Sequence, residues 1–393
     1  MYDTSALINK FSKVFPDSKP AFISIAPGRV ELIGGHTDYN EGFVIASAID
    51  RSCSIVTSPS GDNKISMFSE LTAENHTFEI SDNIPTDKNC TWANYGRGVT
   101  SLLVKKGFRL KGANLYIASD VPLGGGLSSS AALEVAAANA LLALAAQLND
   151  IKPMALAAIC QQAENQWANS PCGIMDQAVS IHGKPQHAVF IDCRTLNVES
   201  IPFHTEDCKI MIFNSMVQHS VGGGEYGERR QSCEKACEIL KQKHPQIKAL
   251  RDANENMLND AKSDFDPVTF KRASHVVTEN ARVLAAKNAA LKGDMHAFGK
   301  LMSASHDSAR DLYQISCPHT DFLAHTIVDC QGALGARISG GGFGGSVVAL
   351  ADSKFAENIA HTVTKAYKKE FDLEMRIYST PAADGAKVIK LEH

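Results

Sequence analysis

The sequence predicts a chain of two domains that both combine helices and strands, in an α/β or α+β arrangement. Its 393 residues exceed what one small hydrophobic core holds. Helical and strand-like segments alternate through the second half, and three glycine-dense loops lie between such segments. No repeat of fixed period indicates a solenoid or a propeller. We expect the division near residue 205, with domains of residues 1–205 and 206–393.

The composition is that of an ordinary globular protein and favours small-molecule partners. The formal net charge is −4, which argues against nucleic acid and anionic membranes as partners. The longest apolar run, Ala131 to Leu148, is interrupted by Glu134 and Asn139, and the first residues lack the apolar core of a signal peptide. Ten scattered cysteines without a C-x-x-C pair are typical of free thiols. We therefore expect a cytoplasmic protein; its sequence carries no signal for the oligomeric state and is compatible with a monomer.

The first half is predicted to open with a short amphipathic helix within residues 1–20. Alternating apolar residues and β-branched runs then indicate strands. The expected strands are residues 21–25, 43–49, 53–57, 64–68, 113–118 and 188–192. The expected helices are residues 91–105, 128–148 and 153–169.

The second half is predicted to alternate long helices with short strands, which favours α+β or α/β. The expected helices are residues 226–243, 267–292, 295–311 and 353–370. The expected strands are residues 210–214, 335–339, 345–351 and 374–380.

The stretch from Pro122 to Leu148 joins three glycines and three serines directly to an Ala/Leu helix. The glycines leave no side chain to obstruct an incoming group, and the first turn of a helix presents unpaired N–H groups that suit phosphate. The serine hydroxyls can cap the helix, bind phosphate or reach magnesium. Neither a Walker A lysine nor a dinucleotide spacing of glycines is present. The stretch therefore predicts a phosphate loop of another kind, and a serine-capped turn is the alternative.

Two further loops concentrate glycine in the same way. APGRVELIGGHTDYNEG, residues 26–42, combines glycines with charged and imidazole side chains, and ISGGGFGGSVVAL, residues 338–350, places five glycines around Phe343. The three loops, in this order, resemble the motifs of the GHMP small-molecule kinases, and the first resembles the galactokinase signature. SPCGIMDQ from residue 170, HSVGGGEYGERR from residue 219 and SASHDSARDLYQIS from residue 303 agree with the same family.

This resemblance implies a fold and an activity. The fold would be that of a two-domain GHMP kinase, with an N-terminal α/β domain, a C-terminal ferredoxin-like α+β domain and the active site between them. The activity would be transfer of the ATP γ-phosphoryl group to the anomeric (C1) hydroxyl of galactose, with ATP and Mg²⁺ as cofactors. Such a transfer depends mainly on positioning and charge neutralisation.

The resemblance also implies roles for individual residues. Asp176 matches the proposed catalytic base, and Arg29 is the cation beside it that would stabilise charge on the γ-phosphate. Ser130 and Glu164 would hold Mg²⁺ through hard oxygen donors. The phosphates would lie on Gly124, Gly125, Gly126, Leu127, Ser128, Ser129 and Ser130. The sugar would contact Gly35, His36, Asp38, Gly173, Asp176 and Tyr226. Without the family these residues would be interpreted as helix caps, salt-bridge partners or solvated side chains.

One position departs from the signature, because Gly35 stands where galactokinases normally have a glutamate expected to bind the sugar's 6-hydroxyl. The loss removes a charge-assisted hydrogen bond worth about 1.5–3 kcal/mol. In one explanation the sugar is galactose, and Glu31, Glu41 or a water molecule replaces the missing group. In the other, the sugar carries a carboxylate at C6, as galacturonate does, which a glutamate would repel. A catalytically inactive sugar- and ATP-binding regulator is a third hypothesis, opposed by the complete GLSSSA stretch and by Asp176.

Overall fold

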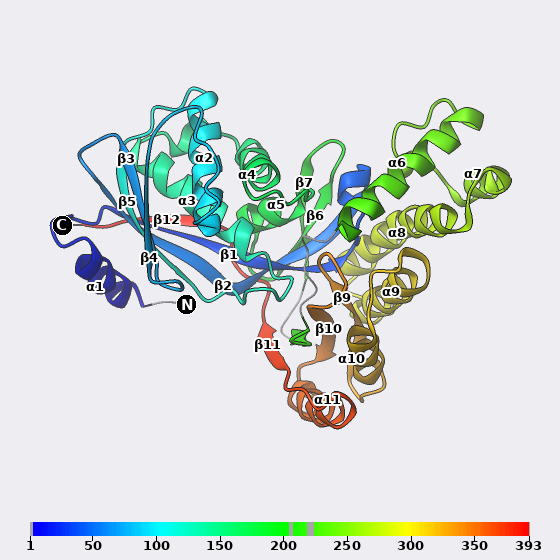
Figure 1. The fold of residues 1–393 in the computed structure, drawn as a ribbon. Helices are drawn as coiled ribbons and strands as arrows, with labels where there is room; N and C mark the ends of the chain where they lie inside the picture. The colour runs from blue at the N-terminus through cyan, green and yellow to red at the C-terminus, as the bar shows by residue number, and fades with distance from the viewer. Residues whose placement is uncertain (1–2, 204–206, 218–223, 393) are drawn as a thin grey trace.

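The computed structural model describes residues 3–203, 207–217 and 224–392. They form two β-sheets with helices packed on both (Figure 1). The larger sheet has eight strands in the order β12-β1-β2-β5-β3-β4, and β6 joins β2 and carries β7. The smaller sheet has four strands in the order β11-β8-β10-β9. The predicted combination of helices and strands in both parts of the chain is confirmed, with a mixed sheet in the N-terminal part and an antiparallel sheet in the C-terminal part.

The larger sheet is built almost entirely from the first half of the chain. Its strands are β1 (Phe22–Ile33), β2 (Phe43–Pro59), β3 (Lys64–Ser69), β4 (Glu74–Glu79), β5 (Ala113–Ser119), β6 (His187–Asp192), β7 (Asn197–Pro202) and β12 (Lys387–Lys390). The helices of this part are α1 (Thr4–Val14), α2 (Asn94–Lys105), α3 (Ser129–Leu144), α4 (Pro153–Trp167) and α5 (Met175–His182). Helix α3 is buried around almost its whole circumference, since it lies between β1 and β2 on one side and α2 and α4 on the other.

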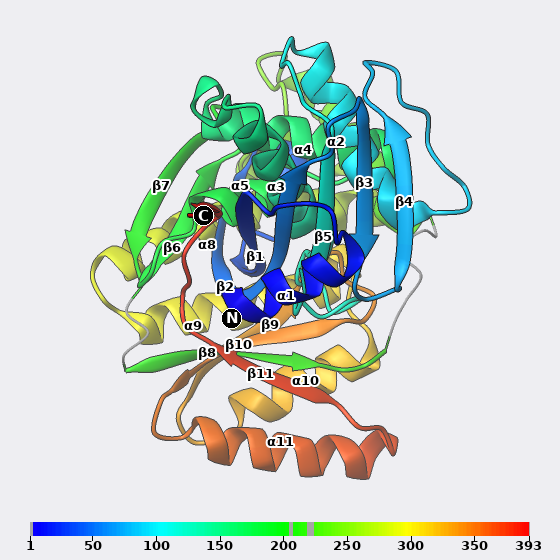
Figure 2. The same ribbon diagram turned by 90° about the vertical axis from the view of Figure 1, so that its left-hand side faces the viewer.

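The smaller sheet is antiparallel throughout and comes from the second half. Its strands are β8 (Cys208–Asn214), β9 (Ala333–Ser339), β10 (Ser346–Asp352) and β11 (Arg376–Thr380). The helices are α6 (Glu225–Lys243), α7 (Glu255–Asp260), α8 (Pro267–Leu291), α9 (Met295–Ser308), α10 (Pro318–Val328) and α11 (Ala356–Phe371). Helices α10 and α11 cover its outer face (Figure 2), and the alternate strand residues on the inner face join the core that includes α9.

The sequence-based prediction misplaced two strands around the first glycine-rich motif. We expected a loop from residue 26, whereas β1 continues through Ile33 and carries Arg29 and Glu31 in the sheet. Residues 43–59 form the single strand β2 instead of two strands. Pro27 and Gly28 suggested a loop, but the register shift between Pro27 and Arg29 accommodates both within the sheet.

Six of these helices and strands were not anticipated: β4, β7, β12, α5, α7 and α10. Strands β4 and β7 are largely exposed, so they lack the apolar alternation that marks a half-buried strand. The expected boundary near residue 205 falls at residues 204–206, outside the described residues, and it stays a prediction. Among the described residues, no helix is both long and apolar enough to cross a membrane.

Candidate active site

The three glycine-rich stretches meet at the middle of β1. The Arg29 backbone N–H donates to the carbonyl oxygen of Leu127 at 3.1 Å, which fixes the phosphate loop against β1. The Ser346 hydroxyl, at the start of β10, donates to the carbonyl oxygen of Gly125 at 2.6 Å. A Cβ on Gly126 would lie 3.1 Å from the carbonyl oxygen of Ser339, so this glycine permits the close approach.

Two adjoining hollows lie at this junction. The first, which we call the loop cleft, is lined by the predicted phosphate loop and the third glycine-rich loop, including Ser128, Ser129 and Ser130. The second, which we call the inner pocket, is lined by Glu31, His36, Asp38, Glu164, Cys172, Gly173 and Tyr226, among others. Arg29, Asp176, Gly340 and Gly341 line both hollows.

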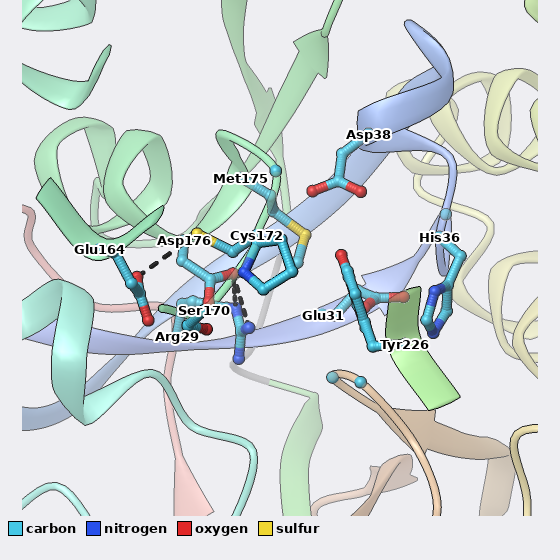
Figure 3. Close-up of a pocket in the computed structure, with 15 residues that line it drawn as sticks. Arg29, Glu31, His36, Asp38, Glu164, Ser170, Cys172, Met175, Asp176 and Tyr226 are labelled. Carbon is cyan, nitrogen blue, oxygen red and sulfur yellow. Dashed lines mark hydrogen bonds and ion pairs between the residues drawn. The ribbon is translucent and has the colours of Figure 1, made fainter. Parts of the chain in front are cut away.

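Asp176 stands at the boundary between the two hollows. It lies in the first turn of α5, and one of its oxygens, Oδ1, accepts hydrogen bonds from Arg29 Nε at 2.7 Å and forms an ion pair with Arg29 Nη2 at 2.6 Å. Its other oxygen, Oδ2, accepts from the Ser128 hydroxyl at 2.5 Å. Arg29 is fixed in turn, because its Nη1 donates to the carbonyl oxygen of Gly126 at 2.6 Å. The carboxylate is therefore held by Arg29 (Figure 3) and by Ser128, and it lines both hollows.

The phosphate loop has a strained backbone. Gly124 and Gly126 have φ of +68° and +69°, and Ser128 adopts a left-handed conformation with φ of +58°. Ser128 precedes α3 but makes no side-chain capping bond, since its hydroxyl donates to Asp176 instead. The simple serine-capped turn is thus not what the structure contains. Strain of this kind at a non-glycine residue is concentrated at functional sites.

Ser130 and Glu164 lie together at the opening of α3. The Ser130 hydroxyl donates to Glu164 Oε1 at 2.8 Å, and the Gln177 amide donates to Glu164 Oε2 at 2.8 Å. The same amide donates to Glu134 Oε2 at 3.0 Å, so Gln177 joins two buried carboxyl groups. Burial, followed by the charge of Asp176, raises the pKa of Glu164. Burial disfavours the charged form of this carboxyl group, and a bound cation would stabilise that form. The carboxylate and the neighbouring hydroxyl are oxygen ligands of the kind that a hard cation prefers.

The inner pocket is acidic. Glu31, Asp38, Glu164 and Asp176 line it. Burial, followed by the charges of Asp176 and Glu31, raises the pKa of Asp38 to about 7. Such a wall offers hydrogen-bond acceptors and suits a ligand that brings several hydroxyl donors.

An aromatic wall closes the pocket on the side away from Glu164 (Figure 3). The ring of His36 lies 5.2 Å from that of Tyr226 and 4.9 Å from that of Tyr313. Its Nδ1 is 2.7 Å from the hydroxyl of Tyr39, which bonds the hydroxyl of Tyr313 at 2.7 Å. Burial is the main cause that lowers the pKa of His36 to about 3, so this imidazole is neutral at physiological pH.

Gly173 is a glycine because Asp38 lies against it. A Cβ at this position would lie 1.7 Å from Asp38 Oδ2 and 2.2 Å from Asp38 Cγ. We expect Gly173→Ala to displace the Asp38 carboxylate and to raise KM for the sugar substrate that the resemblance implies at least about tenfold, the cost of one charge-assisted hydrogen bond. Affinity for ATP, measured by calorimetry, should stay within about threefold.

The matched control for this substitution is Gly227→Ala on α6, where a Cβ would meet no atom within 4 Å. That variant should keep the wild-type KM for the sugar. An unchanged KM in Gly173→Ala would mean that the position of Asp38 does not matter for sugar binding.

The structure brings all of the predicted site residues except Gly35 and Gly125 into the lining of the two hollows, and each of these two glycines directly follows a lining residue. It also adds several residues that the sequence did not single out. Gly35 follows Gly34 at the edge of the inner pocket, beside Glu31 and Arg337. The additional residues are Cys172, Gln177, Tyr39, Tyr313 and Arg337. Cys172 and Gln177 could have been found from the sequence, because they adjoin Gly173 and Asp176 in the SPCGIMDQ motif. Residues 219–223 of the HSVGGGEYGERR segment lie outside the described residues.

Comparisons with known proteins identify the family of the chain. The family model for the galactokinase galactose-binding signature matches residues 9–59, and those for the GHMP kinase N-terminal and C-terminal domains match residues 94–184 and 286–369. The chain is 40% identical over 385 residues to a galactokinase of Roseiflexus sp., covering 98% of this chain and 97% of that one. It is 37% identical over 378 residues to a galactokinase of Canis lupus familiaris, covering 95% and 93%.

Among solved structures, Lactococcus lactis galactokinase complexed with galactose superposes with a TM-score of 0.91, at 31% identity, over 98% of this chain and 99% of that one. A mevalonate kinase, at 17% identity, shares the fold with a TM-score of 0.61. The family models and the superposition with the galactokinase confirm the predicted two-domain GHMP kinase fold, that of a kinase of small molecules. With these matches, the chain belongs to the galactokinases of the GHMP kinase family.

Proposed function

We propose that this protein transfers the γ-phosphoryl group of ATP to the C1 hydroxyl of galactose. The observation that carries the proposal is the place of Asp176, which lines the loop cleft and the inner pocket at once. A sugar in the inner pocket and a triphosphate on the phosphate loop would meet at this carboxylate. The galactokinases among the relatives, and the galactose held by the Lactococcus lactis protein, support galactose as the sugar.

The chemistry then follows from the contacts of Asp176. Its Oδ1 is engaged by Arg29, so the carboxylate is fixed and can accept a hydrogen bond from the C1 hydroxyl, orienting the oxygen toward the γ-phosphorus. As the O–P bond forms, the hydroxyl proton passes to the carboxylate, and ADP leaves with the electron pair of the broken bond. The Arg29 guanidinium lies beside the site of transfer and offsets the charge on the phosphoryl oxygens.

We propose Ser130 and Glu164 as the residues that hold Mg²⁺. Their hydroxyl and carboxylate are hard oxygen donors in contact with each other, which fits this ion. In the part of the chain that the structure describes, no three His, Cys, Asp or Glu side chains gather into a metal site. The remaining ligands would therefore be phosphate oxygens and water, and the bound ion would neutralise phosphate charge.

A galacturonate kinase is the second candidate that the sequence left open, and the inner pocket argues against it. Of the described residues that line this pocket, Arg29 is the one Lys or Arg, and it is paired with Asp176. A carboxylate at C6 would meet Glu31 and Asp38 instead of a free cation, which costs affinity. The neutral hydroxymethyl group of galactose fits this wall.

The deciding experiment is ATP consumption by the purified protein with Mg²⁺, measured in parallel with galactose, galacturonate, N-acetylgalactosamine and glucose. We expect turnover with galactose, and phosphorus NMR of the product should show a phosphate at C1. Turnover with galacturonate alone would overturn the choice of sugar. Binding of galactose and ATP without turnover would support a regulator.

We also propose that the protein is cytoplasmic and monomeric. The support for this proposal is the composition, which is that of an ordinary globular protein.

A further inference from the structure

Glu31 is a buried carboxylate on the wall of the inner pocket, two residues along β1 from Arg29. Side chains two residues apart in a strand share a face, so both project toward the same hollow. Arg29 binds Asp176, at the end of the pocket where transfer occurs. Glu31 lies across the pocket from Glu164, beside His36 and Tyr226 (Figure 3). One face of β1 thus supplies a charged group to each end of the pocket.

Arg337 fixes the direction of Glu31. Arg337 Nη1 donates to Glu31 Oε1 at 2.5 Å, and the two side chains are 1% and 3% exposed. The Glu31 backbone N–H donates to the Ser339 hydroxyl at 3.1 Å. The second carboxylate oxygen, Oε2, accepts no hydrogen bond from any residue that the structure describes. A pocket-lining acceptor without a donor is suited to a ligand hydroxyl.

Gly35 leaves the space in which this ion pair lies. A Cβ on Gly35 would lie 2.6 Å from Arg337 Nη2 and 3.1 Å from Glu31 Oε1. The turn cannot move aside easily, because α8 holds it at two points. The Gly34 N–H donates to Glu279 Oε1 at 3.0 Å, and His275 Nε2 lies 3.1 Å from the carbonyl oxygen of Gly35. A side chain at position 35 and the carboxylate of Glu31 therefore compete for one place beside Arg337.

We infer that Glu31 is the specificity-determining residue for the C6 end of the sugar, and that it supplies from position 31 the carboxylate missing at position 35. The inference rests on the proposed function, which places the C1 hydroxyl at Asp176; the hydroxymethyl group on C5 then lies away from Asp176, toward the part of the pocket that contains Glu31. Glu31 Oε2 accepts a hydrogen bond from the 6-hydroxyl and repels a C6 carboxylate.

The alternative residue, Glu41, is placed elsewhere. Its carboxylate pairs with Arg194 at 2.6 Å, its side chain is 48% exposed, and it does not line the inner pocket. Glu41→Gln is therefore a control that makes the same chemical change outside the site.

The test compares kcat/KM for galactose and for 6-deoxygalactose, which lacks the 6-hydroxyl. Wild-type protein and Glu41→Gln should prefer galactose by about 10–100-fold. Glu31→Gln should lose at least about tenfold on galactose and change less than about threefold on 6-deoxygalactose. Gly35→Glu alone should also lose activity on galactose, because it crowds a second carboxylate against Arg337.

The double variant Glu31→Asn/Gly35→Glu moves the carboxylate without adding one. It should recover a preference for galactose over 6-deoxygalactose to within about threefold of wild type, and circular dichroism with thermal unfolding would show that it folds. In this variant the carboxylate at position 35 pairs with Arg337. The comparison is therefore informative even if Glu31→Gln is unstable.

Three outcomes would overturn the inference: a wild-type protein that phosphorylates both sugars equally, a Glu31→Gln variant that loses the same factor on both, or a folded double variant without preference. Failure of the proposed function has a separate signature, since wild-type protein would then not turn over galactose at all.

Discussion

Replacement of Asp176 by Asn is expected to lower kcat on galactose by about 10²–10⁴-fold, the range by which general acid–base catalysis accelerates a reaction. An amide cannot take up the hydroxyl proton, and it loses the ion pair with Arg29. The variant tests base and positioning roles together. Because the phosphate loop, rather than Asp176, would supply most of the contacts to the phosphates, the Kd for MgATP should stay within about threefold. Steady-state kinetics and calorimetry on the same preparation would measure both quantities.

The control is Asp192→Asn, since Asp192 is also a partly buried aspartate in an ion pair with an arginine, Arg251. It lies on β6 and lines neither hollow, so kcat should stay near the wild-type value. Activity of Asp176→Asn within tenfold of wild type would rule out proton transfer to this residue as an important contribution.

Glu164→Gln is expected to raise the Mg²⁺ concentration that half-saturates the enzyme at least about tenfold. The amide keeps one oxygen but loses the charge that a divalent cation favours, and this carboxylate is one of two proposed protein ligands. The effect should be visible without turnover, as weaker binding of Mn²⁺ in the presence of a non-hydrolysable ATP analogue, followed by electron paramagnetic resonance. KM for galactose should change little at saturating metal.

Glu199→Gln is the control for the metal test, because Glu199 pairs with Lys287 away from both hollows. Ser130→Ala should weaken Mn²⁺ binding in the same direction as Glu164→Gln and by a smaller factor, since a hydroxyl is an uncharged ligand. If the metal dependence of binding and of rate were unchanged in both variants, the ion would have to be held elsewhere.

Much of the fold was accessible from local pattern. The long helices α3, α4, α6, α8 and α11 were predicted to within a few residues, because each carries a sustained helical pattern. Strand β1 was cut short because Pro27 and Gly28 are typical of loops, and only pairing with β2 shows that they belong to the sheet. Strand β12 was missed because its partner, β1, is more than 350 residues away in the sequence.

In the site, too, the sequence did not show the contacts between residues that lie far apart along the chain. The motifs were sufficient to name Arg29 and Asp176, but not to show that Ser128 holds the second oxygen of that carboxylate. The sequence showed that Gly35 lacks the glutamate side chain of the signature. It did not show which group takes the place of that side chain, and Glu31, Glu41 and a water molecule were left as candidates. Deciding between Glu31 and Glu41 requires the direction of each side chain, and Arg337, which fixes Glu31, comes from a strand 306 residues later.

The return of β12 to pair with β1 also bears on how the chain is made. Residues 387–390 complete the sheet edge beside the strand that carries Arg29 and Glu31, while the chain between them forms the whole smaller sheet. During synthesis, that edge of β1 stays open until residues 387–390 have been made, and at 5–20 residues per second the more than 350 residues after β1 take on the order of half a minute. An open edge is a surface on which nascent chains associate, so β1 is exposed to aggregation and to chaperones throughout this interval.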